Sequence, residues 1–279
     1  MKIASAASAD GLDLHCINQW EATFLREEVK HYFAHGIQLE AGATVVDVGA
    51  NIGAFSAYVH QLLGGDVRLF AFEPLPPIFA ILERNVNERF SGRVTALPYG
   101  LSSRDDEAEF TYFPLATLLS SSQRSRENVD TEQQRIAEAI VQWVGQGGAG
   151  QALEKVPTFI MRRIAKRKLR RLTQMETHRV RVRPLSSVID EHDIEVIDLL
   201  KVDVEGAEVD VLRGIADHHW PMVRQAVVEV ESWEKKCPLV QEIFDSRSFQ
   251  VRAEQDSIQK AADIGMIYAI RVPNGPGAL

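Results

Sequence analysis

The chain has 279 residues, of which 45% are apolar and 25% charged, and its formal net charge is −8. This length and composition are typical of a folded domain with a full core, and the negative charge argues against nucleic acid as a partner. No apolar run reaches the about 18 residues of a transmembrane helix, and Cys16 and Cys237 lack a partner motif. We therefore expect a cytoplasmic protein without a membrane partner, a disulfide framework or a zinc site.

The first predicted element is a helix over residues 17–36. Its apolar residues recur near the i, i+4 spacing of an amphipathic helix, and Gly36 marks its end. We expect residues 1–43 to form an N-terminal helical segment that caps a sheet.

Residues 44–56 predict a strand, a tight turn and the start of a helix. Three valines in the first half are β-branched and apolar, as in a strand buried on both faces of a parallel sheet. Gly49 and Gly53 bracket the turn, where a missing Cβ permits unusual φ angles and lets a ligand approach the backbone.

A second strand is predicted over residues 67–72, with Glu73 at its carboxyl end and Pro74 as its stop. An acidic residue at this distance from a glycine turn binds ribose hydroxyls in Rossmann-like folds. Asn51 and Ala54 occupy slots that are glycine in dinucleotide-binding turns. A pyrophosphate needs those glycines but an adenosine cofactor without phosphates does not, so S-adenosylmethionine (SAM) fits better than NAD.

The next elements continue an alternation of helix and strand. Helices are predicted over residues 53–63 and from Pro76 onward, and a third strand over 94–98. Residues 108–113 alternate polar and apolar side chains, which predicts an additional, half-exposed strand.

Residues 114–178 break this alternation, and we predict a helical insertion that lies over the carboxyl edge of the sheet as a lid. Within it, residues 162–171 form a basic cluster in which seven of ten positions are Arg or Lys. Such a run is either a solvated helix face or a surface that binds a partner.

The alternation returns after the insertion. Strands are predicted over residues 178–183, 196–202, 226–231, 249–252 and 266–270, with helices over 185–191 and through Val209 and Leu212. The pattern predicts an α/β fold: a doubly wound, seven-stranded, Rossmann-like sheet with a helical insertion, whose catalytic domain comprises residues 44–113 and 179–272.

Three motifs together resemble the FkbM-type SAM-dependent methyltransferases. They are Val-Val-Asp-Val-Gly-Ala-Asn-Ile-Gly (45–53), Ala-Phe-Glu-Pro (71–74) and Ile-Asp-Leu-Leu-Lys-Val-Asp-Val-Glu-Gly-Ala-Glu (197–208), and Tyr-Phe-Ala-His-Gly-Ile (32–37) is also similar. The resemblance implies a class I methyltransferase that transfers the SAM methyl group to a hydroxyl oxygen, often on a sugar, a polyketide or a nonribosomal peptide.

The resemblance also implies which residues bind SAM. The methionine half would be held by Asp47, Gly49, Asn51 and Gly53. Glu73, followed by Pro74, would accept hydrogen bonds from both ribose hydroxyls. Ser102 is a candidate for the adenine region, and Asp203 lies where the fourth strand meets the amino-acid end of the cofactor.

Several carboxylates follow strands whose carboxyl ends should form the active site. An aliphatic hydroxyl is a poor nucleophile until a base removes its proton. The candidates for catalysis are Asp203, Glu205, Glu229 and Glu231, together with Lys201, which could pair with one of them. Two interpretations of these carboxylates stay open. In the first, one of them is the base, and burial beside its like-charged neighbours raises its pKa. In the second, which we favour less, the carboxylates together bind a divalent metal. His178 and His15 are further candidates for the base.

We therefore expect a SAM-dependent O-methyltransferase that acts on a secondary metabolite, either free or bound to an acyl carrier protein. The acidic carrier would be attracted by the basic cluster 162–171. The alternatives are a sugar O-methyltransferase, a non-catalytic module with this fold, and a nucleic-acid methyltransferase, which the net charge opposes. The tail after residue 272 also suggests a domain cut from a larger assembly-line enzyme.

Overall fold

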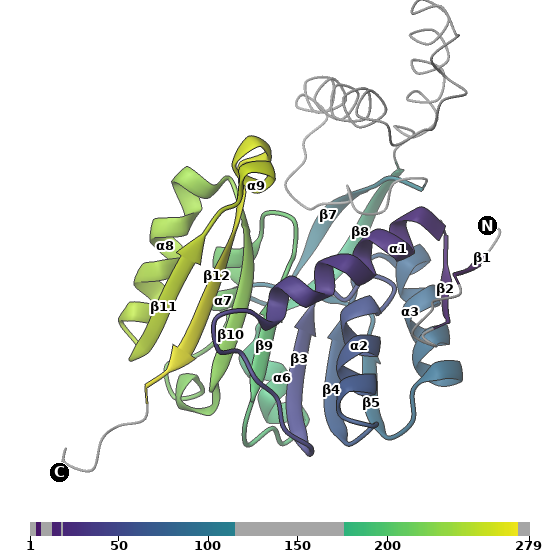
Figure 1. Ribbon diagram of the computed structural model, residues 1–279, viewed down its shortest axis with the longest axis horizontal. Helices are drawn as coiled ribbons and strands as arrows, with labels where there is room; N and C mark the ends of the chain where they lie inside the picture. Colours follow the sequence, from purple (N-terminus) through teal and green to yellow (C-terminus); the bar gives the residue numbers. More distant parts are fainter. Residues whose placement is uncertain (1–3, 7–12, 18, 115–175, 273–279) are drawn as a thin grey trace, which may run out of the picture.

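The computed structural model describes residues 4–6, 13–17, 19–114 and 176–272 (Figure 1). Its main sheet has seven strands in the order β11-β12-β10-β9-β3-β4-β5, which confirms the predicted doubly wound α/β fold. All neighbouring strands are parallel except β12, which runs antiparallel to both β10 and β11. The strands are β3 (Ala43–Val48), β4 (Val67–Phe72), β5 (Arg93–Leu97), β9 (Leu199–Val202), β10 (Gln225–Glu231), β11 (Phe249–Glu254) and β12 (Ile264–Arg271).

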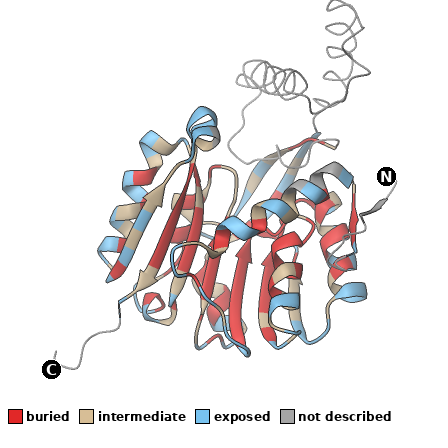
Figure 2. Cartoon of the chain, in the orientation of Figure 1, coloured by how far each residue is buried: buried red, intermediate tan, exposed pale blue. Residues whose placement is uncertain are grey.

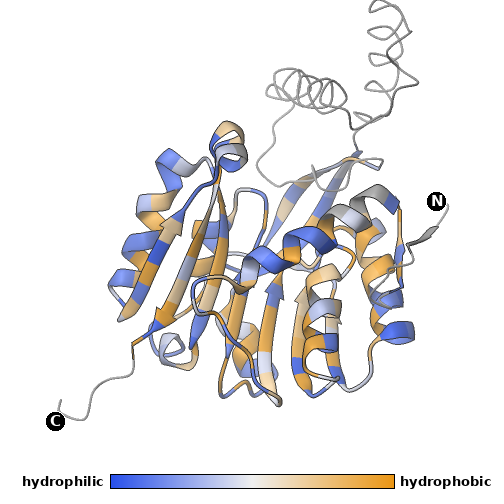
Figure 3. Ribbon diagram, viewed as in Figure 1, coloured by the Kyte–Doolittle hydropathy of each residue, from blue (hydrophilic) through white to orange (hydrophobic). Residues whose placement is uncertain are grey.

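Helices cover both faces of this sheet. Because side chains alternate along a strand, Val45 packs with Phe55 of α2, whereas Val46 belongs to a core cluster with Leu185 of α6. The central strands are accordingly buried and hydrophobic along most of their length (Figures 2 and 3). On the first face lie α1 (Gln19–Glu28), η1 (Val29–Phe33), α2 (Ala54–Leu62) and α3 (Pro76–Arg89); on the second lie α6 (Leu185–Glu191), α7 (Glu208–Arg213) and α8 (Trp233–Asp245).

Shorter helices join the remaining strands. η4 (Trp220–Met222) precedes β10, and α9 (Ser257–Ala262) lies between β11 and β12. In the part of the chain that the structure describes, no helix is long and apolar enough to cross a membrane.

A second sheet of three strands begins beside the carboxyl end of β5. It consists of β6 (Gly100–Leu101), β8 (Glu176–Arg183) and β7 (Asp106–Tyr112), in the order β6-β8-β7. The two strands predicted around residues 108–113 and 178–183 therefore pair with each other, antiparallel, outside the main sheet. The predicted helical insertion between them, including the basic cluster 162–171, lies outside the described residues except at its ends.

The N-terminal segment differs from the single predicted helix. Two short paired strands that the sequence analysis did not predict, β1 (Ala4–Ala6) and β2 (Leu14–Cys16), precede α1. The predicted helix then tightens into the 3₁₀ turn η1. With three residues per turn, η1 places Val29 and Tyr32 on one side, and both are buried.

Candidate active site

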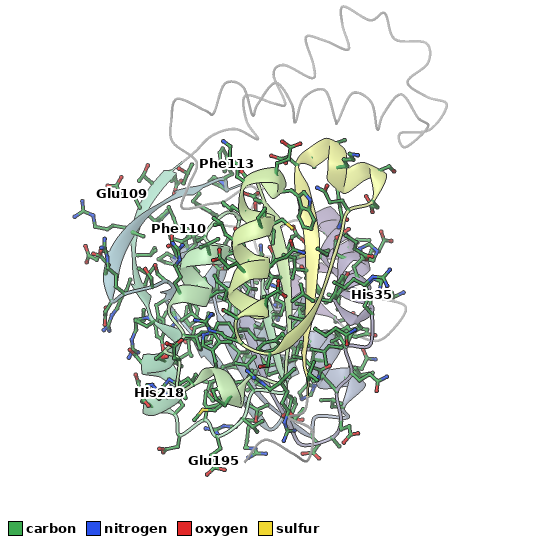
Figure 4. All side chains as sticks on the ribbon, turned by 90° about the vertical axis from the view of Figure 1, so that its left-hand side faces the viewer. His35, Glu109, Phe110, Phe113, Glu195 and His218 are labelled. Carbon is green, nitrogen blue, oxygen red and sulfur yellow. The ribbon has the colours of Figure 1, made fainter. Side chains whose placement is uncertain are left out.

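The candidate site lies at the carboxyl ends of β3, β4, β9 and β10. Asp47, Lys201 and Glu229 alternate with the core residues of the opposite face, so all three lie on the face covered by α2 and η1. Asp47 and Lys201 are register partners on adjacent parallel strands. Glu195 and His218, which precede β9 and β10, lie at the opposite end of the molecule from Phe113, which follows β7 (Figure 4).

Lys201 is the centre of this arrangement and is almost fully buried. Its Nζ lies 3.2 Å from Asp47 Oδ1 and 3.4 Å from Asp203 Oδ2, and it donates a hydrogen bond of 2.9 Å to the carbonyl oxygen of Gly49. One ammonium thus joins β3, the glycine turn after β3, and the residue after β9. The predicted pairing of Lys201 with a carboxylate is present.

The charge state of Lys201 follows from these neighbours. Burial alone lowers the pKa of an ammonium, but the charges of Asp47 and Asp203 outweigh it and raise the pKa of Lys201 above its ordinary value. Its Nζ also lies 5.5 Å from the ring centre of Tyr32 and 5.8 Å from that of Phe55, where the faces of the rings favour a cation. Lys201 is therefore a permanent cation that organises the site, and it is not suited to accept a proton.

Asp47 is fully buried, and its second oxygen is also held. Ser56 of α2 donates a 2.7 Å hydrogen bond to Asp47 Oδ2. Because both oxygens point to protein groups, Asp47 braces the strand β3 against α2 and Lys201.

Glu73, directly after β4, is the second buried carboxyl of the site. The backbone N–H of Leu75 donates a 2.9 Å hydrogen bond to Glu73 Oε1, and the backbone of Asn51 also donates to this carboxyl. Burial raises the pKa of Glu73 to about 7, although these donors and the charge of Lys201 act in the opposite direction. The structure thus brings Glu73 against the glycine turn, and Pro74 packs beside Gly100.

The two glycines of the turn are required by protein contacts. Gly49 has a φ of +77°, and a Cβ there would lie 1.8 Å from the carbonyl oxygen of Asp203. Gly53 has a φ of +89°, and its Cβ would meet Leu82 of α3 at 2.9 Å. Asn51 also has a positive φ, of +51°, and its side chain accepts a hydrogen bond from the N–H of Ile52. The turn is therefore fixed before any ligand binds.

The other predicted carboxylates differ in their surroundings. Burial, together with the charges of Asp203 and Glu28, raises the pKa of Glu229 well above its ordinary value. Glu205 has a φ of +53° and lies in the turn after β9, while Glu231 ends β10; both are partly exposed. A further carboxylate after β9, Glu208, which was not among the candidates, is fully buried and accepts a 2.6 Å hydrogen bond from the N–H of Gly206, so it stabilises the start of α7.

Three predicted candidates make their contacts elsewhere. The N–H of Ser102 donates to the carbonyl of Arg183 in the small sheet. His15 pairs with Glu88 of α3 at 2.7 Å, and His178 lies 3.4 Å from Glu176 within β8. Among the residues that the structure describes, no group of three or more His, Cys, Asp and Glu side chains is arranged to hold a metal ion.

Sequence reasoning missed two residues that reach the site from the N-terminal segment. Tyr32 donates a hydrogen bond of 2.9 Å to Asp203 Oδ2, and the charge of Glu28 acts on Glu229. The motif around residues 32–37 was the available signal for Tyr32, but nothing in it indicated that this residue contacts the end of β9.

Three comparisons relate this geometry to known proteins. A family model described as the methyltransferase FkbM domain matches residues 47–249. The chain is 34% identical over 266 residues to the 31-O-demethyl-FK506 methyltransferase FkbM of Streptomyces tacrolimicus, covering 94% of this chain and 95% of that protein. It is 33% identical over 265 residues to the AMB antimetabolite synthetase AmbE of Pseudomonas aeruginosa, covering 91% of this chain but spanning only 12% of the synthetase.

A solved structure is also similar. The crystal structure of the methyltransferase FkbM from Methylobacillus flagellatus is 16% identical, with a TM-score of 0.48, and the match covers 90% of this chain and 51% of that chain.

Proposed function

Because the chain belongs to the FkbM methyltransferase domain family, we propose that it transfers the methyl group of SAM to a hydroxyl oxygen of a secondary metabolite. The observation that carries the choice of oxygen is the similarity, along nearly all of both chains, to a protein named for methylating 31-O-demethyl-FK506. A sugar hydroxyl is the alternative acceptor.

The described residues fit SAM as the cofactor. Glu73 offers a buried carboxyl at the end of β4, where ribose hydroxyls bind in Rossmann-like folds, and the turn through Gly49, Asn51 and Gly53 is fixed beside it. Asp203 would face the methionine half directly, and Asp47, whose oxygens face Ser56 and Lys201, would act on it through Lys201. SAM supplies a methyl group on a positively charged sulfur, and the surplus of carboxylates over Lys201 suits that charge.

We propose that the protein removes the acceptor proton by a carboxylate. Asp203 and Glu229 lie on the same face at adjacent strand ends, and the charge of Asp203 contributes, after burial, to the raised pKa of Glu229. Positioning of the acceptor oxygen in line with the methyl group supplies much of the rate, and a general base adds about 10²- to 10⁴-fold.

The direct test incubates the protein with methyl-labelled SAM and 31-O-demethyl-FK506 or simple hydroxylated polyketides. We expect labelled product whose mass spectrum places the methyl group on oxygen. We expect the rate to be insensitive to EDTA, since a carboxylate base needs no metal; collapse of the rate would favour the metal reading. A protein that binds SAM but methylates none of these acceptors would favour a non-catalytic module.

Glu73 gives a test of SAM binding that needs no acceptor. The ionised carboxylate is the better acceptor for ribose hydroxyls, so at pH values below about 7 binding must first remove a proton from Glu73. We expect the dissociation constant of SAM, measured by calorimetry, to fall by up to about tenfold between pH 6 and pH 8.

The matched control is Glu73→Gln, which keeps the shape of the side chain and does not titrate. It should bind SAM at least about tenfold more weakly at pH 8, the scale of one charged hydrogen bond. Any pH dependence that remains in this variant belongs to other groups, including the amino group of SAM. Equal affinity and an equal slope in both proteins would remove Glu73 from the cofactor site.

A carrier-bound acceptor is a second proposal, and the similarity to a short part of the synthetase AmbE supports it. The basic cluster 162–171 supplies the charge that an acidic acyl carrier protein would need, although it lies outside the described residues. In the same assay, a carrier-bound acceptor should be methylated faster than its free thioester analogue at low salt, and this advantage should shrink in 1 M salt, where the Debye length is about 3 Å.

A further inference from the structure

Tyr32 links the N-terminal segment to the candidate base. It is buried in η1, and its hydroxyl donates to Asp203 Oδ2 over 2.9 Å. Its neighbours on the chain fix its position: Phe33 stacks on Phe55 of α2, with ring centres 5.9 Å apart. The Tyr32 ring itself meets Phe55 edge-on at 5.5 Å. Its hydroxyl therefore has little freedom to leave the carboxylate.

Both contacts of the Asp203 carboxylate fall on the same oxygen. Oδ2 accepts from Tyr32 and faces Lys201 at 3.4 Å, while no donor in the described part of the chain reaches Oδ1. The side chain of Asp203 is 23% exposed, unlike the fully buried Asp47, so a ligand can reach the Asp203 carboxylate. The hydrogen bond from Tyr32 and the ion pair with Lys201 both act on Oδ2, which leaves Oδ1 to accept from another donor.

We propose that Tyr32 is a positioning residue that holds Asp203 with Oδ1 turned toward the acceptor hydroxyl. This inference rests on the proposed function. In the transfer, the acceptor oxygen forms the bond to the methyl carbon, and the sulfur keeps the electron pair of the broken bond. The acceptor proton passes to Asp203 Oδ1, so atoms and charge balance without another reactant.

The surroundings keep Tyr32 in the donor role. Burial, followed by the charges of Asp203 and Glu229, raises the pKa of Tyr32 well above its ordinary value, so the phenol stays protonated. Among the residues that the structure describes, the charged and titratable groups that face Asp203 are Glu28 on α1, Tyr32 on η1, Lys201 on β9 and Glu229 on β10, with Asp47 on β3 beyond Lys201.

The test compares Tyr32→Phe with Tyr268→Phe. Tyr268 of β12 donates a 2.9 Å hydrogen bond to the carbonyl of His31, so its variant loosens the same 3₁₀ turn without touching Asp203. We expect Tyr32→Phe to lower kcat by about 10²-fold, the effect of a misplaced reacting group. Tyr268→Phe should stay within about threefold of the wild type, and both variants should have unfolding midpoints similar to that of the wild type. Each kcat is measured at saturating SAM, because Asp203 is also expected beside the methionine half of the cofactor.

Two readouts separate positioning from a structural role. A hydrogen bond to a carboxylate favours its ionised form, so the acid limb of the kcat/KM profile should move to higher pH in Tyr32→Phe and stay in place in Tyr268→Phe. In the background of Asp203→Asn, Tyr32→Phe should cause no further loss, because it acts through that carboxylate.

Each other outcome overturns the inference in a distinguishable way. If the wild type is active and Tyr32→Phe has the same kcat and the same acid limb as the wild type, the role of Tyr32 is wrong, but the proposed function stands. A full additional loss in the double variant assigns Tyr32 a structural role. A wild type that binds SAM but transfers no methyl group overturns the proposed function and the inference together.

Discussion

Replacing Lys201 by Met is expected to destabilise the protein by about 3 to 5 kcal/mol, the cost of leaving buried charge without its partner. The side chain of Lys201 is buried, and its Nζ lies within 3.4 Å of both Asp47 and Asp203. Its loss therefore leaves the fully buried Asp47 carboxylate without a cation and removes the ion pair of the partly exposed Asp203. The carbonyl of Gly49 also loses its donor. Urea unfolding measures this change, and SAM binding should be lost with it because the turn and the end of β9 are no longer joined.

Two controls identify buried charge as the cause. Arg224→Met breaks an ion pair of 2.6 Å with Asp198, but the arginine is 64% exposed, so the loss should be no more than about 1 kcal/mol. Adding Asp47→Asn to Lys201→Met removes one stranded charge and should restore part of the lost stability. If Lys201→Met costs no more than Arg224→Met, the ammonium does not hold these strands together.

The sequence was sufficient to predict the main sheet, because its signals were local. The apolar runs of β3, β4 and β10 each have the length and composition of a strand buried on both faces, and each was placed to within two residues. The small sheet was predicted only as separate strands. The pairing of β7 with β8 joins segments separated by more than 60 residues, and no periodicity within either strand encodes that partner.

The candidate site shows the same limit. Glu73 and Asp203 were predicted because they follow strands whose carboxyl ends meet at one edge of a parallel sheet. Asp47, which lies within β3, was implied by the resemblance to the FkbM-type methyltransferases. Tyr32 was not, since its contact with Asp203 depends on a 3₁₀ turn that tightens the end of a predicted α-helix. The roles of the glycines also depended on contacts: the reading of Gly49 as an approach for a ligand gave no hint of the Asp203 carbonyl beside it.

Gly49→Ala is the second change with a large expected effect. An alanine at a φ of +77° costs about 1 to 2 kcal/mol relative to glycine, because its Cβ crowds the following carbonyl. The new Cβ would also lie 1.8 Å from the carbonyl oxygen of Asp203. Neither atom can rotate away, because the Cβ is attached directly to the backbone of β3 and the Asp203 oxygen belongs to the backbone after β9. The ends of the two strands must therefore separate, and this overpacking lowers the free energy of unfolding by about a further 1 to 3 kcal/mol. The separation displaces Asp203, so methyl transfer should fall even in the fraction that remains folded.

Gly42→Ala distinguishes the two causes. Gly42 has a nearly equal φ of +83°, yet nothing lies within 4 Å of where its Cβ would be. It should therefore show the backbone cost of about 1 to 2 kcal/mol and no loss of SAM binding. The difference between the two variants in urea unfolding isolates the contact with Asp203. If both variants lose the same unfolding free energy, the ends of β3 and β9 separate at no measurable cost. The geometry of the site would then depend on the contacts of Lys201 and Tyr32.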